Sequence, residues 1–377
     1  MAKRILIITA FFEENFQYQE IQIADTLHSM KYDVTVLTTD RSYFLKDKHR
    51  RVTFSSKPYP VIRLTDLIRI TDTVFVYSGL RKTLSSLAFD TVLLIYPSHG
   101  LGYFALRHIQ KEVKVISFFQ EHTGISSYTK FKNKFIKFFI KNIWYREIFK
   151  RSFRIAAITP ETIERFKNNA MFRSLIWGKI GLLGLGFNPD MFYYNDILRS
   201  NLRNTHGIPE NGVVLITVTR ILEYKPVWQW IQPIIEALSV SDSLYYILIG
   251  FTDSSYSIDL KAKIKEAKLN NRIILLDILN PEKINQYFCC ADYGIWFIAA
   301  SISIQQSMGT GLPVILPANK IFEHLITPSE NGFYYSSGPE LKNLLISLSN
   351  EMFKREEVLA FNQKFSYRFM LKELLGN

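Results

Sequence analysis

Two cations lie five residues apart in the second half of the chain, just after a run of apolar residues. Arg220 and Lys225 follow the apolar run 213–218 in the segment ITVTRILEYKP, and a helix rich in Trp, Ile and Leu is predicted at 227–238. Cations in the loop between a strand end and a helix start can neutralise a diphosphate. The first N–H groups of the helix attract the same anion. Considered alone, both residues could be ordinary surface charges.

Three further strands in this half are predicted to end near the same place. The apolar run YYILIG ends at Gly250, where a missing side chain would allow another group to come close. The strand RIILL leads into the loop 277–279, and the strand YGIWFI leads through the small residues 299–303 into a helix. Because the carboxyl ends of parallel strands lie along one edge of a sheet, we expect these loops to surround one ligand.

The order of these segments resembles that of GT-B glycosyltransferases of the retaining family-4 type. The motifs are TRILEYKP, LIG, ADYGIWF, QSMGTGLPV and ENGFYY, and the resemblance spans most of the chain. It implies an α/β protein with two Rossmann-like, doubly wound domains that face a cleft. It also implies a C-terminal helix that crosses back to the first domain.

The same resemblance implies an activity. The protein would be a glycosyltransferase of the hexosyl class that works without a metal ion or a cofactor. Its donor would be a nucleotide-diphosphate sugar, with UDP or GDP as the expected nucleotide. Its acceptor would be a lipid-linked saccharide or a growing surface glycan such as lipopolysaccharide or capsule, and transfer would retain the anomeric configuration.

The resemblance also assigns roles to residues of the second domain. Arg220 and Lys225 would stabilise the diphosphate as the leaving group forms. Backbone N–H groups of residues 301–304 would face the phosphate end, and the loop around Ile278 would lie near the base. The full set of donor-binding residues that it implies is Gly186, Arg220, Lys225, Gly250, Ile278, Ser301, Ser303, Ile304 and Gln306.

Two positions depart from the family pattern. Where the family has carboxylates, this chain has Ile298 and Gln306. Gln306 can hydrogen-bond ribose hydroxyls without a charge, whereas isoleucine cannot, so that Ser301 or Ser303 would have to serve instead. Either the donor sugar is unusual, or transfer is weakened or lost. A non-catalytic nucleotide-sugar-binding or scaffold protein of a membrane glycan-assembly complex is therefore a second hypothesis, and a sugar-nucleotide epimerase is a third.

The first half of the sequence alternates short apolar strands with helical stretches. Strands are predicted at 5–9, 33–38, near Val61, 92–96, 113–119, 155–158 and 180–183. This alternation is typical of a parallel sheet that helices cover on both faces. The loop AFFEENFQYQE after the first strand is expected to face the cleft and to offer Phe12, Glu13 and Gln19 to the acceptor. The alternative is that its phenylalanines pack the following helix onto the sheet.

Two histidines follow later strands of this half. His99 lies in YPSHG and His122 in FFQEHTG, directly after Glu121. A histidine in a cleft can hydrogen-bond a sugar or phosphate, or carry a proton near neutral pH. In similar enzymes a histidine after the corresponding strand lies beside the transferred sugar, and His122 matches that position better. We therefore predict His122 as a catalytic residue with Arg220 and Lys225, and His99 and Glu121 as cleft residues. A loop histidine bonded to backbone is the alternative.

The charge of the chain points to an anionic partner. The formal net charge is +12, and no nucleic-acid-binding motif is recognisable. On a helix, Lys130, Lys134, Lys137 and Lys141 would form one stripe, with phenylalanines on the flanks and the opposite face. This pattern predicts peripheral binding to an anionic membrane surface from the cytoplasmic side, on the inner face of the membrane. A phenylalanine face packed on the sheet with merely solvated lysines is the alternative.

Length and cysteine content complete the prediction. The 377 residues suffice for two domains, expected at 1–188 for acceptor binding and 189–355 for nucleotide-sugar binding, with a C-terminal helix at about 356–377. Docking of that helix on the first domain would use Phe361, Phe365, Phe369 and Leu371. The only two cysteines are adjacent, which favours a reducing compartment, and no Cys/His cluster suggests a metal. The N-terminal segment superficially resembles a signal peptide, but its apolar run is short and no cleavage site follows, so we expect a buried strand there. No uncharged apolar stretch is long enough to span a bilayer.

Overall fold

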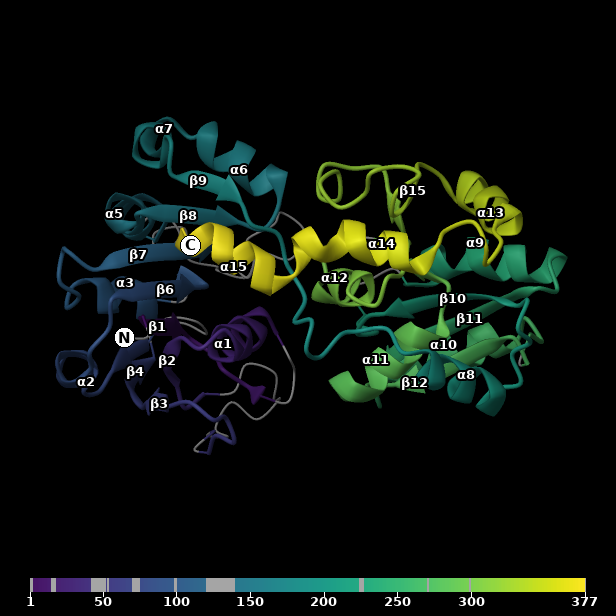
Figure 1. Cartoon of the computed structure of the whole chain (residues 1–377), viewed down its shortest axis with the longest axis horizontal. Coiled ribbons are helices and arrows are strands. Elements are labelled where there is room, and N and C mark those ends of the chain that lie inside the picture. The colour runs from purple at the N-terminus through teal and green to yellow at the C-terminus, as the bar shows by residue number, and fades with distance from the viewer. Residues whose placement is uncertain are drawn as a thin grey trace. The chain divides into compact units, whose positions relative to one another are not determined.

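The computed structural model describes residues 3–14, 18–41, 52, 54–69, 75–97, 100–119, 140–223, 227–269, 271–297 and 300–376. By their contacts the residues group into two units: in Figure 1 the first is purple to teal with a yellow C-terminal segment, and the second is teal to yellow. The first unit is Met1–Leu185 with Met370–Asn377, and the second is Gly186–Phe369. Among the described residues, no helix has the length and apolar character needed to cross a bilayer.

The first unit contains a seven-stranded parallel sheet, which confirms the predicted α/β class. Its strand order is β3-β2-β1-β6-β7-β8-β9. The bounds are β1 (Arg4–Thr9), β2 (Asp33–Thr39), β3 (Val61–Leu64), β6 (Thr91–Ile95), β7 (Lys114–Phe119), β8 (Arg154–Ala157) and β9 (Ile180–Leu182). All five residues of β6 are buried, as expected for a central strand that is covered on both faces.

Short helices and one hairpin complete this unit. They are α1 (Gln19–Ser29), β4 (Asp66–Arg69), β5 (Phe75–Tyr77), α2 (Leu80–Ser86), α3 (Leu101–Leu106), the π-helical turn η4 (Ile140–Trp144), α5 (Tyr145–Arg151), α6 (Pro160–Lys167) and α7 (Ala170–Ile176). Aromatic rings from β7, α5, α6 and α7 pack edge to face or tilted, with the centroids of Phe149 and Phe166 5.2 Å apart. Helix α6 starts where the Thr159 hydroxyl accepts a hydrogen bond from Thr162 N–H and Pro160 occupies the first turn.

The second unit contains a six-stranded parallel sheet of order β12-β11-β10-β13-β14-β15. The strands are β10 (Val213–Val218), β11 (Leu244–Phe251), β12 (Ile273–Asp277), β13 (Tyr293–Ile295), β14 (Val314–Pro317) and β15 (Gly332–Tyr335). The helices are α8 (Asp196–Thr205), α9 (Val227–Val240), α10 (Ser255–Lys265), α11 (Pro281–Cys290), α12 (Ile302–Met308), α13 (Gly338–Ser347), α14 (Arg355–Asn362) and the 3-10 turn η5 (Gln363–Phe365). The last helix, α15 (Tyr367–Leu375), begins in this unit, and its residues from Met370 onward belong to the first unit.

The strand β10 shows how both faces of this sheet are used. Val214, Ile216 and Val218 pack in one core with residues of α11 and α12. Val213 and Leu215 pack in another core with residues of α9, α10 and α13. Since successive side chains of a strand point to opposite faces, one fully apolar strand supplies two cores. The predicted bounds of this strand, 213–218, are confirmed.

The strand predicted from YGIWFI is shorter than expected. It ends at Ile295, and Trp296 and Phe297 follow it outside the sheet. The Trp296 ring lies over Gly294, where an added Cβ would come within 2.4 Å of it. Its indole N–H donates to the carbonyl of Val218 at 3.1 Å. The apolar run predicted a longer strand because sequence pattern alone cannot show that a large ring folds back onto its own strand.

The C-terminal segment is divided between the two units. Phe365 packs in the core of the second unit and Phe369 is 48% exposed, so the expectation that both dock on the first domain is wrong. Residues 370–377 belong to the first unit, where Leu371 is fully buried. The Arg154 guanidinium donates to the carbonyls of Glu373 at 2.7 Å and Leu374 at 3.0 Å. The end of the helix is therefore held by a cation on its last carbonyls.

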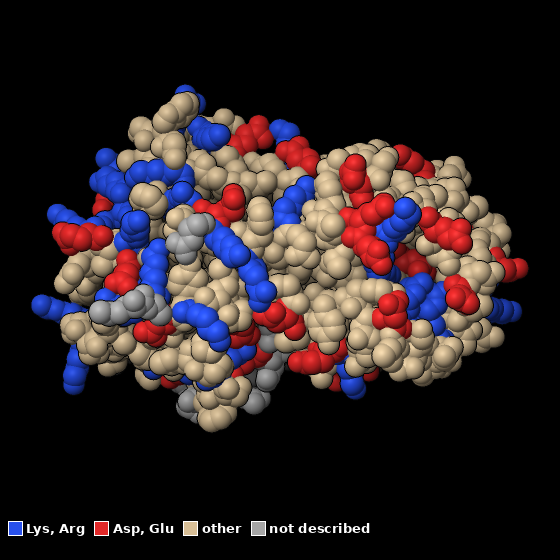
Figure 2. All heavy atoms as spheres, viewed as in Figure 1, with Lys and Arg blue, Asp and Glu red and all other residues tan. Residues whose placement is uncertain are grey.

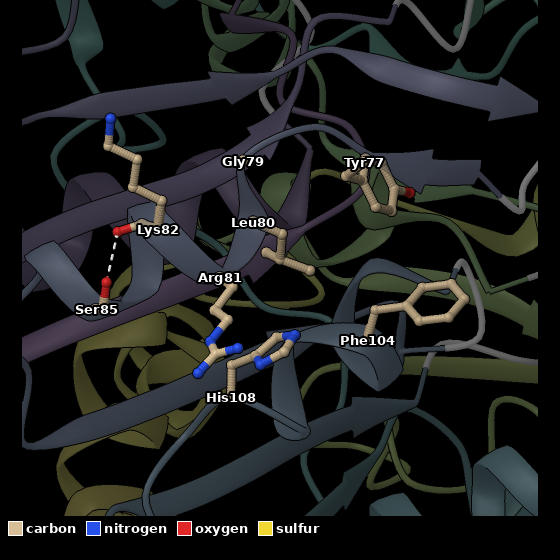
Figure 3. Close-up of a pocket in the computed structure, with 8 residues that line it drawn as sticks. All are labelled: Tyr77, Gly79, Leu80, Arg81, Lys82, Ser85, Phe104 and His108. Atoms are coloured by element: carbon tan, nitrogen blue, oxygen red, sulfur yellow. Dashed lines mark hydrogen bonds between the residues drawn. The ribbon is translucent and has the colours of Figure 1, made fainter.

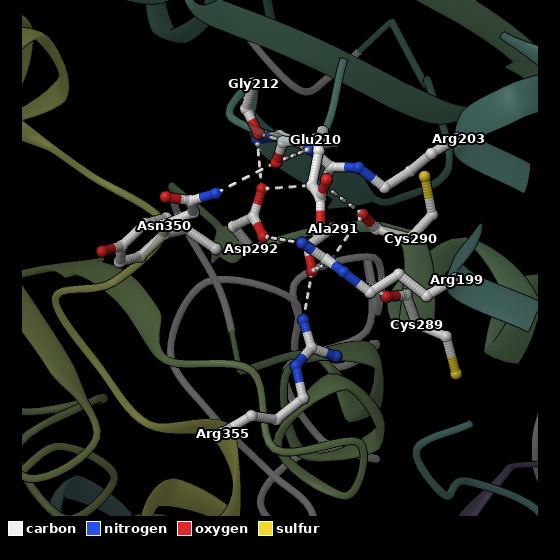
Figure 4. A network of polar contacts seen from close by, with 12 residues as sticks. Arg199, Arg203, Glu210, Gly212, Cys289, Cys290, Ala291, Asp292, Asn350 and Arg355 are labelled. Atoms are coloured by element: carbon white, nitrogen blue, oxygen red, sulfur yellow. Dashed lines mark hydrogen bonds and ion pairs between the residues drawn. The ribbon is translucent and has the colours of Figure 1, made fainter. Parts of the chain in front are cut away.

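A buried carboxylate joins three elements of the second unit (Figure 4). Asp292, which precedes β13, accepts hydrogen bonds from Arg199 at 2.6 Å and Arg203 at 3.2 Å, both on α8. It also accepts the N–H of Val214 in β10 at 2.7 Å. Arg199 and Arg355 donate further to the carbonyl of Ala291. Burial of these charges is tolerated because each has partners of opposite polarity.

We expect Asp292→Asn to lower the free energy of unfolding by about 3–5 kcal/mol, because two arginines would lose the charge that compensates them. Urea unfolding of both proteins measures the difference. Asp253→Asn is the control, since Asp253 is exposed on the same unit. Equal losses in the two variants would contradict this account of Asp292.

Candidate functional site

The loop after β10 carries Arg220 at the carboxyl edge of the second sheet. Thr219 N–H donates to Ile249 O and Ile221 N–H donates to Gly250 O, both at 3.0 Å. These bonds extend the β10–β11 ladder beyond the end of β10, so the backbone on either side of Arg220 is fixed. The Arg220 side chain is half-buried.

Gly250 gives this loop the space it needs. Its φ is +127°, and an added Cβ would lie 1.9 Å from the carbonyl oxygen of Thr219. The sequence predicted a close approach at this glycine, with the donor as the approaching group. In the structure the approaching group is the chain's own loop, which makes Gly250 a residue that positions Arg220.

A second cluster lies one strand further along the same edge. The carbonyl of Val218 accepts the Trp296 indole N–H at 3.1 Å and the Ser303 hydroxyl at 2.8 Å. The hydroxyls of Ser301 and Ser303 lie 2.8 Å apart. Ser303 is 5% exposed, so its hydroxyl ties α12 to the end of β10 rather than standing free for a ligand. The Ile304 N–H donates to Ser301 O at 3.1 Å, which argues against its predicted hydrogen bond to the phosphate.

The other predicted donor residues differ in exposure. Ile278 follows β12 and is 50% exposed, which suits a contact with a planar base. Gln306 is buried on α12, and its bonding to ribose stays a prediction. Gly186 faces the C-terminal segment: an added Cβ there would lie 2.7 Å from Phe365 O. The space beside Gly186 is therefore occupied by Phe365 and Tyr367, and its contact with the donor stays a prediction.

In the first unit, the loop after β1 carries the predicted acceptor residues. Phe12 is fully buried, so the prediction that it faces the acceptor is wrong and its ring packs inside the unit. Its carbonyl accepts a hydrogen bond from Arg63 at 3.1 Å, and Arg63 lies 3.7 Å from the Glu14 carboxylate. Glu13 and Gln19 are 8% and 1% exposed.

The start of α1 holds three buried side-chain atoms that lack a hydrogen-bond partner among the described residues. Both amide atoms of Gln19 and Oε2 of Glu20 are buried and make no hydrogen bond there. Burial raises the pKa of the Glu20 carboxyl to about 8, with a smaller contribution from the charge of Glu13. Glu20 was not among the predicted site residues, although it directly follows Gln19. Buried polar groups usually have partners, so an unpaired amide beside a carboxyl with one unpaired oxygen indicates a place where a polar ligand could bind.

Several predicted residues lie outside the described part of the chain. They are Lys225, His99, Glu121, His122, Ile298, Lys130, Lys134 and Lys137. The side chain of Lys141 is also outside it, although its backbone lies in η4. Within the described ranges, no group of three or more His, Cys, Asp or Glu side chains could hold a metal ion. Cys289 and Cys290 are free and buried there.

No family model matches the sequence, and no curated protein matches it. Solved structures match over nearly its whole length. HepE from Anabaena in complex with UDP has a TM-score of 0.70 at 16% identity, covering 99% of this chain and 98% of that one. The chain has the GT-B fold. Sucrose-phosphate synthase from Thermosynechococcus elongatus matches this GT-B chain with a TM-score of 0.67 at 15% identity, covering 99% and 98%.

WaaG, a glycosyltransferase involved in lipopolysaccharide biosynthesis, matches with a TM-score of 0.58 at 15% identity, covering 97% of this chain and 94% of its own. All three structures are distant in sequence, and their likeness establishes the fold. The two parallel sheets described above are the two Rossmann-like sheets of GT-B proteins.

We expect Gly250→Ala to destabilise the protein by about 2–3 kcal/mol or more, through strain at positive φ and a backbone clash with Thr219. Gly207→Ala is a matched control, because Gly207 also has a positive φ, +63°, but nothing within 4 Å of the added Cβ. That control should cost only about 1–2 kcal/mol. Thermal and urea unfolding compare the two. A Gly250→Ala protein no less stable than the control would refute the clash.

The Glu20 carboxyl should make stability depend on pH. Its pKa is raised on folding, so its contribution is complete below pH 4.5 and is lost as the pH rises toward 8. Glu20→Gln should therefore leave stability nearly unchanged at pH 4.5 and raise it at pH 8, by at most about 4 kcal/mol. Urea unfolding across this range, with Glu112→Gln at an exposed site as control, tests this. A pH-independent difference would show that Glu20 is not held protonated.

Proposed function

We propose that the protein transfers a sugar from a nucleotide-diphosphate donor to a lipid-linked or growing surface-glycan acceptor. One observation carries the proposal: HepE, which shares the fold over 98% of its length, has been solved with UDP and with UDP-glucose. The position of Arg220 in a fixed loop at the carboxyl edge of the second sheet supports it, because nucleotides bind at that edge in such sheets. UDP is accordingly the first donor nucleotide to test, and GDP the second.

The proposed reaction is direct and retains the anomeric configuration. The bond between the anomeric carbon and the diphosphate oxygen breaks, and a bond to the acceptor oxygen forms on the same face of the sugar. The acceptor proton passes to the leaving diphosphate. Arg220 and Lys225 stabilise the negative charge of that diphosphate, so that no metal ion is required, and His122 contacts the sugar.

The proposed acceptor groups are the polar residues that follow β1. Glu13 and Gln19 precede or begin α1, and the unpartnered amide of Gln19 can both donate to and accept from a hydroxyl. An acceptor hydroxyl that occupied this place would satisfy polar atoms that are otherwise buried without partners. His99 and Glu121 are proposed to complete the acceptor side.

The proposed location is the inner face of the membrane, with peripheral binding from the cytoplasm. The first unit holds 30 Lys and Arg against 16 Asp and Glu, a net charge of +14, whereas the second holds 16 against 18. On the face in Figure 2, Lys and Arg are scattered over the first unit, at left, among uncharged residues. Each cation near an anionic surface contributes on the order of 1 kcal/mol, so the Lys130–Lys141 stripe would bind reversibly.

The donor site is tested by nucleotide binding. Thermal unfolding with UDP, GDP, dTDP, ADP and their sugars should show stabilisation by one nucleotide, because a ligand of the folded state raises the melting temperature. Arg220→Ala and Lys225→Ala should each weaken that nucleotide by about tenfold or more, since a charge-assisted bond is lost. Lys283→Ala, an exposed cation on α11, should not. Absence of any shift in the parent protein would refute the donor site.

The substitution of two family carboxylates by Ile298 and Gln306 favours a second candidate, a non-catalytic nucleotide-sugar-binding or scaffold protein. The two functions differ in turnover. A transferase releases the free nucleoside diphosphate only with an acceptor, whereas a binding protein releases none. If Lys225→Ala abolishes nucleotide binding but leaves the glycans of the cell unchanged, the second candidate is favoured. An epimerase would convert the sugar nucleotide with no acceptor present.

A further inference from the structure

A cavity of about 650 Å³ opens in the first unit between α2 and α3 (Figure 3). It is lined by Tyr77, Gly79, Leu80, Arg81, Lys82, Ser85, Phe104 and His108. None of these residues is acidic, and three of them carry nitrogen groups that bind anions. The cavity is thus both basic and partly aromatic.

The basic side of the cavity is formed by Arg81 and His108. Figure 3 shows their side chains next to each other, while Lys82 extends away from both. Neither they nor Lys82 form an ion pair with any residue that the structure describes. The neighbouring Arg107 differs, because its guanidinium donates to the Tyr103 hydroxyl at 2.8 Å. Among the described residues the planar donors of Arg81 thus have no anionic partner, and their fork geometry suits a phosphate.

The apolar side of the cavity is formed by buried residues and by a ring that packs on Trp144. Leu80 and Tyr77 are buried, with 7% and 8% of their surfaces exposed. Phe104 meets the ring of Trp144 edge to face at 5.8 Å, and Tyr103 stacks on the same Trp144 ring at 4.9 Å. A ligand that fits both sides has a phosphate joined to an apolar group.

The cavity is separate from the proposed acceptor site of the same unit. Four residues after α2 the chain enters the amino end of β6, and seven residues after α3 it enters the amino end of β7. The acceptor residues Glu13 and Gln19 follow the carboxyl end of β1, at the opposite edge of the parallel sheet. A ligand in this cavity would therefore leave that edge free.

We propose that this cavity binds the phosphate headgroup of an anionic lipid. The phosphate pairs with Arg81 and His108, and the start of the acyl region contacts Phe104 and Leu80. The net charge of +14 on this unit draws an anionic surface toward it. Trp144, which supports Phe104, ends η4, into which the lysine-rich segment leads. The inference deepens the proposed membrane association and rests on it, but it does not depend on nucleotide binding.

Calorimetric titration with a short-chain, water-soluble phosphatidic acid tests the proposal. Arg81→Gln should weaken binding by about tenfold or more, because the charged hydrogen bonds to the phosphate are lost. Arg173→Gln is the matched control: it removes one exposed cation from α7 of the same unit and should change the affinity less than about twofold. Ser85→Trp, which fills the cavity without a change in charge, should weaken binding as much as Arg81→Gln does.

Titrations with two other ligands distinguish a lipid headgroup from free phosphate. Inorganic phosphate should bind weakly, and short-chain phosphatidylcholine, whose phosphate is balanced by a quaternary ammonium, should not compete. Equal binding of phosphatidic acid by the parent protein and Arg81→Gln would overturn the proposal, as would inorganic phosphate binding as tightly as the lipid. Nucleotide binding is measured on the same variants: its retention in Arg81→Gln separates loss of this site from failure of the donor site.

Discussion

The second unit depends on one buried carboxylate. Asp292 compensates two arginines of α8 and also accepts the N–H of Val214, the second residue of β10. Three elements that are distant in sequence therefore share one charge, and a shift of any of them would break a buried ion pair or a buried hydrogen bond. Such a cluster adds little net stability compared with apolar packing, but it is very sensitive to the loss of one member. Its importance lies in fixing where β10 begins.

The position of β10 in turn fixes the candidate donor edge. The strand is six residues long, and its last carbonyl, that of Val218, receives the indole of Trp296 and the hydroxyl of Ser303. Thr219 and Ile221 then continue the ladder to β11 past Gly250. Hydrogen bonds of the backbone thus fix both ends of β10: Val214 N–H bonds to Asp292 at its start, and Thr219 and Ile221 bond to β11 on either side of Arg220. A cation placed in this way needs little reorganisation to meet a diphosphate.

Parts of this arrangement could be read from the sequence, and the reasons for success and failure are physical. The bounds of β10 are clear because a strand buried on both faces must be apolar throughout. A close approach can be predicted at Gly250, but a glycine does not reveal which group approaches, and here it is the chain itself. Phe12 was ambiguous because aromatic rings serve cores and ligands equally well. Glu20 was missed because an unpaired carboxyl is visible only once its surroundings are known. The ADYGIWF motif contains Asp292, but the motif does not indicate that two arginines about 90 residues earlier pair with the charge of this carboxylate.

The uneven distribution of charge between the two units has a consequence for how the protein interacts with charged surfaces. One unit is strongly cationic and the other is slightly anionic, so the chain resembles a macroion with all of its excess charge in one part. A negatively charged surface would attract the first unit and weakly repel the second. Because fields decay within about 8 Å at physiological ionic strength, this difference would act only at short range. The excess charge of the chain is thus a property of one unit, and an ionic-strength effect on binding to such a surface would report on that unit alone.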